Sequence, residues 1–134
     1  MKNYTDLEQS KKLAEILPIE SADMEYLAIK ETGKLVGSIP FVKDDSEVED
    51  SAYSHTYDRI VCWSLAALLE QLHYEVCDDD GYSTYLQINK DDDMYQLEYI
   101  DPSEIFESIE TDRYEHFVDA CYEMVIKLNK LNLL

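Results

Sequence analysis

The sequence predicts an α+β fold with a single domain over residues 1–134. Two segments alternate apolar and polar residues on either side of a turn, whereas others repeat apolar residues at helical spacing. A length of 134 residues suits one domain, and a hydrophobic content of 46% allows a buried core. We therefore expect the order α-ββ-α-ββ-α, with an antiparallel sheet of about four strands and the helices packed on one face.

The first helix is expected over residues 5–17. Thr5 and Glu8 have the spacing of a capping box, in which each side chain accepts a hydrogen bond from the other residue's backbone N–H. Leu13 and Leu17 belong to a partial apolar stripe. Pro18 should end the helix, because a residue that precedes proline is pushed out of the α region.

A β-hairpin should follow, with strands over 25–30 and 35–42. Leu27 and Ile29 alternate with polar or small neighbours, and Gly33 can supply a left-handed turn position. Pro40 cannot donate to a ladder hydrogen bond, so the second strand should lie at an edge or end there.

The middle of the chain is expected to contain an acidic loop and then a buried helix. Residues 44–58 carry six acids and no base, without a hydrophobic period, so we expect an exposed loop. Residues 60–72 are apolar nearly all round, which is typical of a helix buried on several sides. This run is too short to cross a membrane.

A second hairpin is expected from strands over 82–89 and 94–100, joined by a four-residue loop at 90–93. Their alternating residues give each strand one apolar or aromatic face. Residues 74–77 can add a short strand before the turn at 78–81.

The last helix has the clearest pattern and is expected to begin near Arg113. Its apolar residues recur at alternating spacings of four and three: Phe117, Cys121, Met124, Leu128 and Leu131. Its acids fall on the opposite face: Asp112, Glu115, Asp119 and Glu123. The helix should therefore be the main packing element of the fold.

The charge restricts the partners. The net charge is −19 at pH 7, and residues 44–134 alone carry 23 acids and 5 bases. Nucleic acids and anionic membranes would repel such a chain, whereas a protein with a basic surface would attract it. High net charge also serves solubility alone.

The three cysteines are widely spaced, and no apolar leader begins the chain, so we expect a reducing cytoplasm.

Cys62 is the one candidate nucleophile. It would lie in the first turn of the helix over 60–72, with His73 or His116 as a base, as in a small Cys-His hydrolase. The alternative is a small buried side chain in an apolar helix, which is the common role of a free cysteine. No oxyanion motif accompanies Cys62, so we expect a structural residue, no enzymatic activity and no cofactor.

The acidic clusters do not have the spacing of a metal site. When Gly81 is aligned with the glycine of an EF-hand loop, Val76 and Gln87 fall at the positions that require Asp and Glu. We therefore expect the acids at 78–80 to serve an exposed turn, and we expect no metal ligands. The acids at 104, 107 and 110 should likewise form a solvated face.

Tyrosine is the unusual aromatic residue here, with 11 copies against three Phe and one Trp. Tyrosine is enriched at interfaces, although β-propensity explains it equally well. The leading hypothesis is a non-enzymatic acidic module that binds another protein through an acidic, tyrosine-bearing side. A DNA-mimic decoy of a DNA-binding enzyme is the alternative. The expected binding residues are Tyr85, Tyr95, Tyr99, Asp91, Asp92, Asp93, Glu115, Asp119 and Glu123.

Two blocks carry a resemblance to other proteins. They are the Cys-Trp-Ser-Leu-Ala-Ala-Leu-Leu run at 62–69 and the run from Asp119 to Leu133. With the opening stretch 4–23, they resemble a group of small proteins encoded by gut anaerobes and by their phages and mobile elements. The resemblance implies a bacterial cytoplasm, and it assigns no activity and no site residue.

Overall fold

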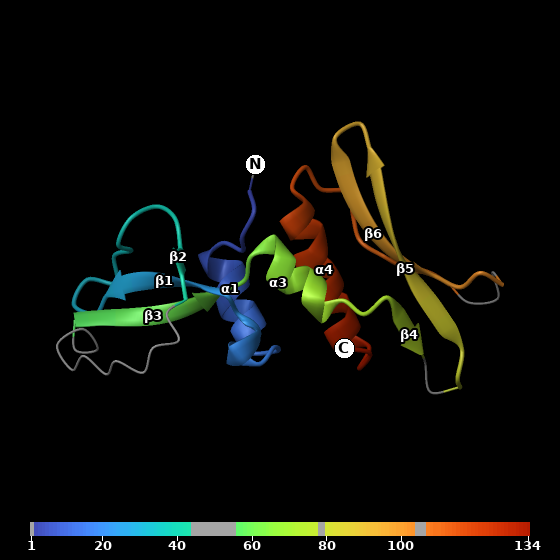
Figure 1. Ribbon diagram of the computed structural model, residues 1–134, viewed down its shortest axis with the longest axis horizontal. Helices are drawn as coiled ribbons and strands as arrows, with labels where there is room; N and C mark the ends of the chain where they lie inside the picture. Colours follow the sequence, from blue (N-terminus) through green and yellow to red (C-terminus); the bar gives the residue numbers. More distant parts are fainter. Residues whose placement is uncertain (1, 44–55, 78–79, 104–106) are drawn as a thin grey trace. The chain divides into compact units, whose positions relative to one another are not determined.

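A computed structural model describes residues 2–43, 56–77, 80–103 and 107–134 (Figure 1). Over these residues the fold is α+β, as predicted, with antiparallel sheets of three and four strands and three α-helices. The chain divides into two compact units. Residues 4–64 form the amino-terminal unit, and residues 1–3 with 65–134 form the carboxy-terminal unit.

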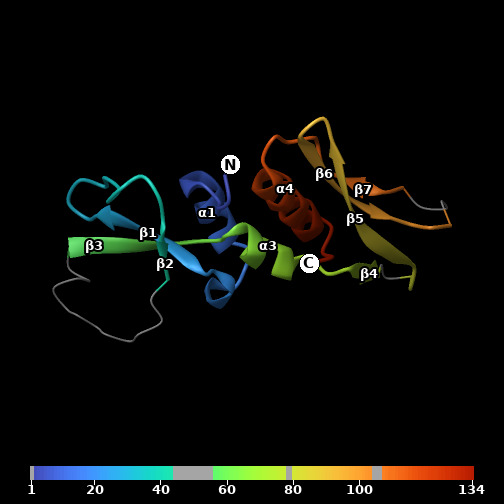
Figure 2. The same ribbon diagram turned by 45° about the horizontal axis from the view of Figure 1, so that its top comes forward.

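The strands form two antiparallel sheets, of three and four strands, where the sequence predicts one sheet of about four strands. The first hairpin belongs to the sheet β2-β1-β3, and the second hairpin belongs to the sheet β4-β5-β6-β7. Each sheet also contains a strand that the hydrophobic pattern did not indicate. These strands are β3 (Tyr57–Cys62) in the first sheet and β7 (Ile109–Glu110) in the second. Figure 2 shows β7 beside β6.

Helix α1 (Leu7–Ala14) is shorter than the predicted helix over 5–17. Its N-cap is Asp6, whose side chain accepts from the Gln9 N–H while the Gln9 side chain accepts from the Asp6 N–H. The capping box therefore lies one residue later than expected. The Thr5 hydroxyl is instead buried and accepts a 3.1 Å hydrogen bond from the Trp63 N–H.

The sheet of the amino-terminal unit is centred on β1 (Met24–Ile29). It pairs with all six residues of β3, from Met24 opposite Cys62 to Ile29 opposite Tyr57. The turn at Gly33 is confirmed, with φ of 69° and a 2.6 Å bond from its N–H to the Ile29 carbonyl oxygen. The predicted strand over 35–42 is reduced to an isolated bridge at Leu35 and to β2 (Phe41–Val42).

The single helix predicted over 60–72 is wrong. Its first three residues end strand β3, and only Leu65–Gln71 form a helix, α3. A continuous apolar run fits a buried strand as well as a buried helix, and the β-branched pair Ile60 and Val61 favours the strand. Of the predicted acidic loop over 44–58, residues 44–55 lie outside the described residues. Its last two residues, Tyr57 and Asp58, begin β3.

The second hairpin is confirmed and is longer than predicted. Strands β5 (Ser83–Asp91) and β6 (Met94–Ile100) pair up to the final pair Asp91 opposite Met94. The loop therefore has two residues, Asp92 and Asp93, with φ of 47° and 63°. This is the geometry of a type I′ turn, whose twist matches that of the strands. The short strand expected at 74–77 is β4 (Glu75–Cys77).

Helix α4 (Phe117–Lys130) covers one face of this sheet (Figures 1 and 2). It begins at Phe117 rather than near Arg113, because Tyr114 forms an antiparallel bridge with Tyr95 of β6. Its inner face is fully buried together with two residues of β6, and α3 packs against it. These core residues are Val118, Cys121, Met124, Val125, Leu128, Leu97 and Tyr99. Of the predicted seam, Phe117 is half-buried, and Leu131 is 53% exposed.

The two ends of the amino-terminal unit meet. Tyr4 and Ser64 form an antiparallel bridge, flanked by a 2.9 Å bond from the Thr5 N–H to the Trp63 carbonyl oxygen. Within the carboxy-terminal unit, the Leu65 N–H donates to the Asn3 carbonyl oxygen at 2.8 Å. None of the described helices is long and apolar enough to span a membrane.

Candidate functional site

A pocket of about 270 Å³ opens at the turn end of the β5–β6 hairpin, within the carboxy-terminal unit. We call it the Tyr95 pocket. It takes residues from the end of β5, the turn, the start of β6 and the segment that leads into α4. Its lining residues are Lys90, Asp93, Tyr95, Glu115 and His116.

Two contacts hold the segment before α4 against the hairpin. The backbones of Tyr95 and Tyr114 exchange hydrogen bonds of 2.6 and 2.8 Å. The Arg113 guanidinium forms an ion pair with Asp91, with 3.3 Å between nitrogen and oxygen. Glu115 and His116 are thereby placed beside the turn, although they lie more than 20 residues away in the sequence.

The Tyr95 ring forms the aromatic wall of the pocket. It stacks on the ring of Phe117, the first residue of α4, with 5.1 Å between centroids and 13° between planes. The Lys90 ammonium lies 5.5 Å from the Tyr95 centroid, because Lys90 and Tyr95 are cross-strand partners in the hairpin. This is a cation–π arrangement. The pocket therefore already holds one cation over an aromatic face, with the carboxylates of Asp93 and Glu115 on the same lining.

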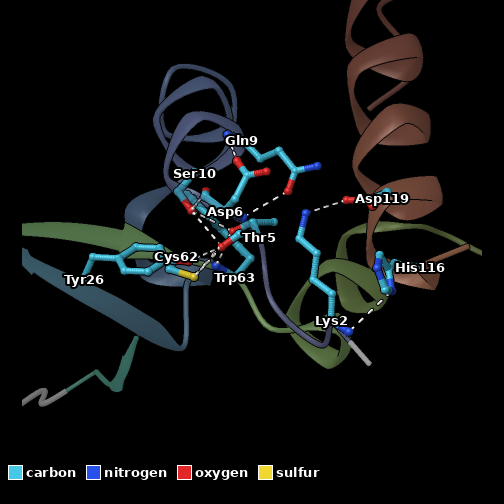
Figure 3. A network of polar contacts seen from close by, with 10 residues as sticks. All are labelled: Lys2, Thr5, Asp6, Gln9, Ser10, Tyr26, Cys62, Trp63, His116 and Asp119. Carbon is cyan, nitrogen blue, oxygen red and sulfur yellow. Dashed lines mark hydrogen bonds and ion pairs between the residues drawn. The ribbon is translucent and has the colours of Figure 1, made fainter. Parts of the chain in front are cut away.

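The amino terminus contacts the segment at His116. The backbone N–H of Lys2 donates to His116 Nδ1 at 3.4 Å, and the Lys2 ammonium binds Asp119 at 2.7 Å (Figure 3). Asp119 lies in the first turn of α4, where a carboxylate also suits the helix dipole.

A second acidic group surrounds the Tyr114 hydroxyl. Burial, then the hydrogen bond to Glu123 and the charges of Glu123, Asp112 and Asp119, raise the pKa of Tyr114 to about 12. Glu123 also accepts a 3.0 Å bond from the Asp112 N–H and pairs with Lys127 at 3.6 Å. Glu123 therefore helps to hold the segment before α4 in place, instead of only forming part of a solvated outer face of the helix.

The structure brings together three of the nine predicted binding residues. Asp93, Tyr95 and Glu115 line one pocket. Asp92 is exposed at the turn beside them. The other acids of the set lie close by in sequence or space but form ion pairs: Asp91 with Arg113, Asp119 with Lys2, and Glu123 with Lys127.

The remaining two predicted residues do not belong to this site. Tyr99 is fully buried, and its hydroxyl donates a 2.6 Å bond to the His73 carbonyl oxygen. Tyr85 lies five residues before Lys90 on β5, about 17 Å away at the usual strand rise, and its ring packs against Tyr74. Both therefore support packing in the same unit.

Sequence reasoning missed Lys90 and His116 as members of the site. The sequence pattern predicts Lys90 in a four-residue loop, which hides its cross-strand pairing with Tyr95. A two-residue turn at Asp92 and Asp93 would have revealed that pairing, but Asp-Asp is a weaker turn signal than Asn-Gly or Asp-Gly. The sequence indicates His116 only as a possible base for Cys62, because its position in the pocket depends on contacts distant in sequence.

Cys62 lies in a buried polar cluster of the amino-terminal unit (Figure 3). Its thiol donates to the Thr5 carbonyl oxygen at 3.3 Å, and the Tyr26 hydroxyl donates to the same oxygen at 2.8 Å. The Thr5 and Ser10 hydroxyls are 2.8 Å apart. Burial raises the pKa of Cys62, against the lowering effect of its hydrogen bonds. A buried, protonated thiol is a poor nucleophile.

The other cysteines and the acidic runs add no second site over the described residues. Cys121 is buried in the core of the carboxy-terminal unit, and burial raises its pKa to about 12. Cys77 is exposed. No group of three or more His, Cys, Asp or Glu side chains is placed to hold a metal ion in the part of the chain described. Glu104 and the acids at 78–79 lie outside that part, and Glu110 lies in β7.

Comparison with known protein families, curated proteins and solved structures found no match to this chain.

Proposed function

We propose that this protein is a non-enzymatic interaction module that binds a basic side chain of another protein in the Tyr95 pocket. The observation that carries the proposal is the lining itself: an aromatic face that already holds a cation, with two carboxylates beside it. Lysine and arginine are the side chains that such a lining recognises, through cation–π attraction and charge-assisted hydrogen bonds.

The net charge of −19 supports the same partner class. It would draw a basic surface toward the protein and speed the encounter, whereas it would repel nucleic acids and anionic membranes. The bacterial cytoplasm and the mobile-element origin stay predictions, and they direct the search for the partner to cytoplasmic bacterial proteins.

The ion pairs favour a local binding site over an extended imitation of DNA. Asp91, Asp119 and Glu123 each pair with a cation of the same unit, which reduces the field they present. Asp92, Asp93 and Glu115 form no ion pair among the contacts described, and they lie at one end of the hairpin. A short acidic cluster can bind one or two basic side chains, but it is too small to imitate a row of DNA phosphates.

A binding measurement with a defined probe tests the proposal. The probe is the fluorescently labelled peptide Ac-GRGKG-NH2, titrated with protein at 50 and 200 mM NaCl. The variant Asp93→Asn/Glu115→Gln should bind at least fivefold more weakly than the native protein. The matched control Glu20→Gln/Glu31→Gln removes the same charge from exposed positions of the amino-terminal unit and should change affinity by less than twofold. Equal weakening in both variants would mean diffuse charge attraction and would reject the pocket.

Two further variants act in opposite directions on the same probe. Tyr95→Leu removes the aromatic face and should weaken binding about two- to fivefold, the usual size of an exposed cation–π contact. Lys90→Gln removes the competing internal cation and should strengthen binding. Weaker binding to Lys90→Gln would show that the pocket does not receive a cation. Displacement of duplex DNA from a basic protein, insensitive to all pocket variants, would favour the decoy alternative instead.

A further inference from the structure

The edge of β5 next to the Tyr95 pocket has backbone groups that β4 does not reach. Strand β4 pairs only with Ser83–Tyr85 of β5, and the ladder ends with the Leu86 N–H, which donates to the Tyr74 carbonyl oxygen at 2.9 Å. Over the described residues, no strand pairs with β5 on this side beyond Leu86.

The direction of the Leu86 bond identifies the exposed groups. Successive residues of a strand point their N–H and C=O groups to opposite edges, so Ile88 and Lys90 point theirs to the same edge as Leu86. The neighbouring residues Gln87, Asn89 and Asp91 point theirs toward β6. Ile88 and Lys90 therefore offer a short row of two donors and two acceptors, and the Ile88 side chain is 48% exposed.

This edge leads directly into the Tyr95 pocket, because Lys90 belongs to both. Leu86, Ile88 and Lys90 lie opposite Tyr99, Leu97 and Tyr95, so their side chains share the face that α4 covers. A strand added at the edge would place alternate side chains on that face. One such side chain would lie beside Ile88. The side chain two residues away in the added strand would lie beside Lys90, within reach of the pocket carboxylates.

We propose that an extended, basic segment of the partner protein adds to the sheet along Ile88–Lys90 and inserts a Lys or Arg side chain into the Tyr95 pocket. This proposal rests on the proposed function and specifies the binding mode. Main-chain hydrogen bonds supply affinity in such strand addition, and side-chain pockets supply specificity. An antiparallel segment, the direction that β4 takes on the same edge, would read basic-x-apolar, with the apolar residue against Ile88.

Charge decides against a second copy of this chain as the occupant. Two copies paired along β5 would bring together two chains of −19 each, which repel one another. Lys90 also matches the usual protection of an edge strand against self-pairing. A basic strand is instead attracted by the net charge of −19 and by the carboxylates of Asp93 and Glu115 in the pocket lining.

Three peptides of equal charge test the proposal. The first is Ac-SKTRTVTKS-NH2, which has the basic-x-apolar spacing. The second, Ac-SKTTRVTKS-NH2, places Arg and Val on opposite faces of a strand. The third has the first sequence with N-methyl groups on the backbone amides that would face β5. We expect the second and third to bind at least tenfold more weakly than the first. Hydrogen exchange of the Ile88 and Lys90 amides should slow at least tenfold when the first peptide saturates the protein.

The outcomes separate the binding mode from the pocket. Equal affinity for all three peptides, with loss in Asp93→Asn/Glu115→Gln, would overturn strand addition and leave the pocket intact. Affinity that does not respond to that double variant would reject the pocket as well. Slow exchange of the Ile88 amide without peptide, together with a dimer in sedimentation, would assign the edge to a second copy and overturn the proposal. Ile88→Pro removes one edge donor. Among the three peptides, it should weaken the binding of the first only, and circular dichroism checks that the variant folds.

Discussion

The Arg59 guanidinium holds the Glu25 carboxylate with two parallel hydrogen bonds of 2.8 and 3.0 Å across β1 and β3. The Glu25 side chain is 7% exposed and that of Arg59 is 43% exposed, so the carboxylate is the partner that depends on the contact. A buried charge that loses its partner costs more free energy than the pair itself contributes.

Arg59→Ala should therefore lower the free energy of unfolding by about 1–3 kcal/mol, below the range for fully buried pairs because Arg59 is partly solvated. The free energy of unfolding of Arg59→Lys should lie between those of the native protein and Arg59→Ala. Lysine keeps the charge but loses the bidentate hydrogen bonding of arginine. Urea unfolding measures all three proteins. Adding Glu25→Gln to Arg59→Ala should restore part of the loss, and a further equal loss would contradict this explanation.

The core of the carboxy-terminal unit depends on the inner face of α4. Leu128 is 1% exposed, so Leu128→Ala should cost about 2–5 kcal/mol in urea unfolding. Asn129→Ala, at the adjacent exposed position, should change stability by less than about 0.5 kcal/mol. Similar losses for the two variants would mean that the buried face is assigned wrongly.

The two-residue turn of the second hairpin can be improved. Asp92 and Asp93 both have positive φ, which asparagine and glycine adopt at lower cost. Asp92→Asn/Asp93→Gly should raise the free energy of unfolding by about 1 kcal/mol. Asp92→Val places a β-branched residue in the left-handed region and should destabilise by about 1–2 kcal/mol. Thermal unfolding compares them, and a loss for the Asn-Gly variant would argue against the type I′ turn.

The thiols should differ in reactivity. Cys77 is exposed, whereas Cys62 and Cys121 are fully buried. A neutral-pH thiol reagent should therefore modify one cysteine rapidly in the native protein and none in Cys77→Ser. All remaining thiols should react in denaturant. Rapid modification of Cys62 in the Cys77→Ser variant would contradict its burial and would restore the hydrolase hypothesis.

Stability should fall at alkaline pH. Burial raises the pKa of Cys121 from 9.0 to about 12, so the folded protein keeps a proton that the unfolded chain loses first. The stabilisation is complete below pH 9 and is lost as pH rises from 9 to about 12. Tyr99 and Tyr114, with pKa values raised from 10.0 to about 12, act in the same direction.

The urea midpoint should therefore decline from pH 8.5 to pH 10.5. The decline should be shallower in Cys121→Ala, whatever the variant's stability at pH 7, because one titrating group is gone. An identical slope in the two proteins would show that Cys121 does not contribute.

Local patterns predicted the elements whose partners lie nearby. The second hairpin and the last helix depend on alternation and on the spacing of Cys121, Met124 and Leu128, which are visible in the sequence. The segment over 60–72 failed because hydrophobicity alone does not distinguish a buried strand from a helix. The start of α1 shifted because Thr5 bonds with Trp63, a residue 58 positions away.

The candidate site was predicted in part for the same reason. Asp93, Tyr95 and Glu115 have side chains typical of a binding site, but their meeting follows from the backbone hydrogen bonds between Tyr95 and Tyr114, which no local pattern encodes. Acidity also overstated the site, because charge counts do not reveal that Asp91 and Asp119 have cationic partners.

The bridge between Tyr4 and Ser64 has a consequence for the order in which the chain is made. Every residue of the amino-terminal unit has been synthesised by position 64, whereas residues 1–3 belong to a unit completed only by α4. The contacts of Lys2 with His116 and Asp119 span 114 and 117 residues. Lys2 can therefore make these contacts only after His116 and Asp119 have been synthesised, and closing so long a loop is slow because its entropy cost comes before the contacts form.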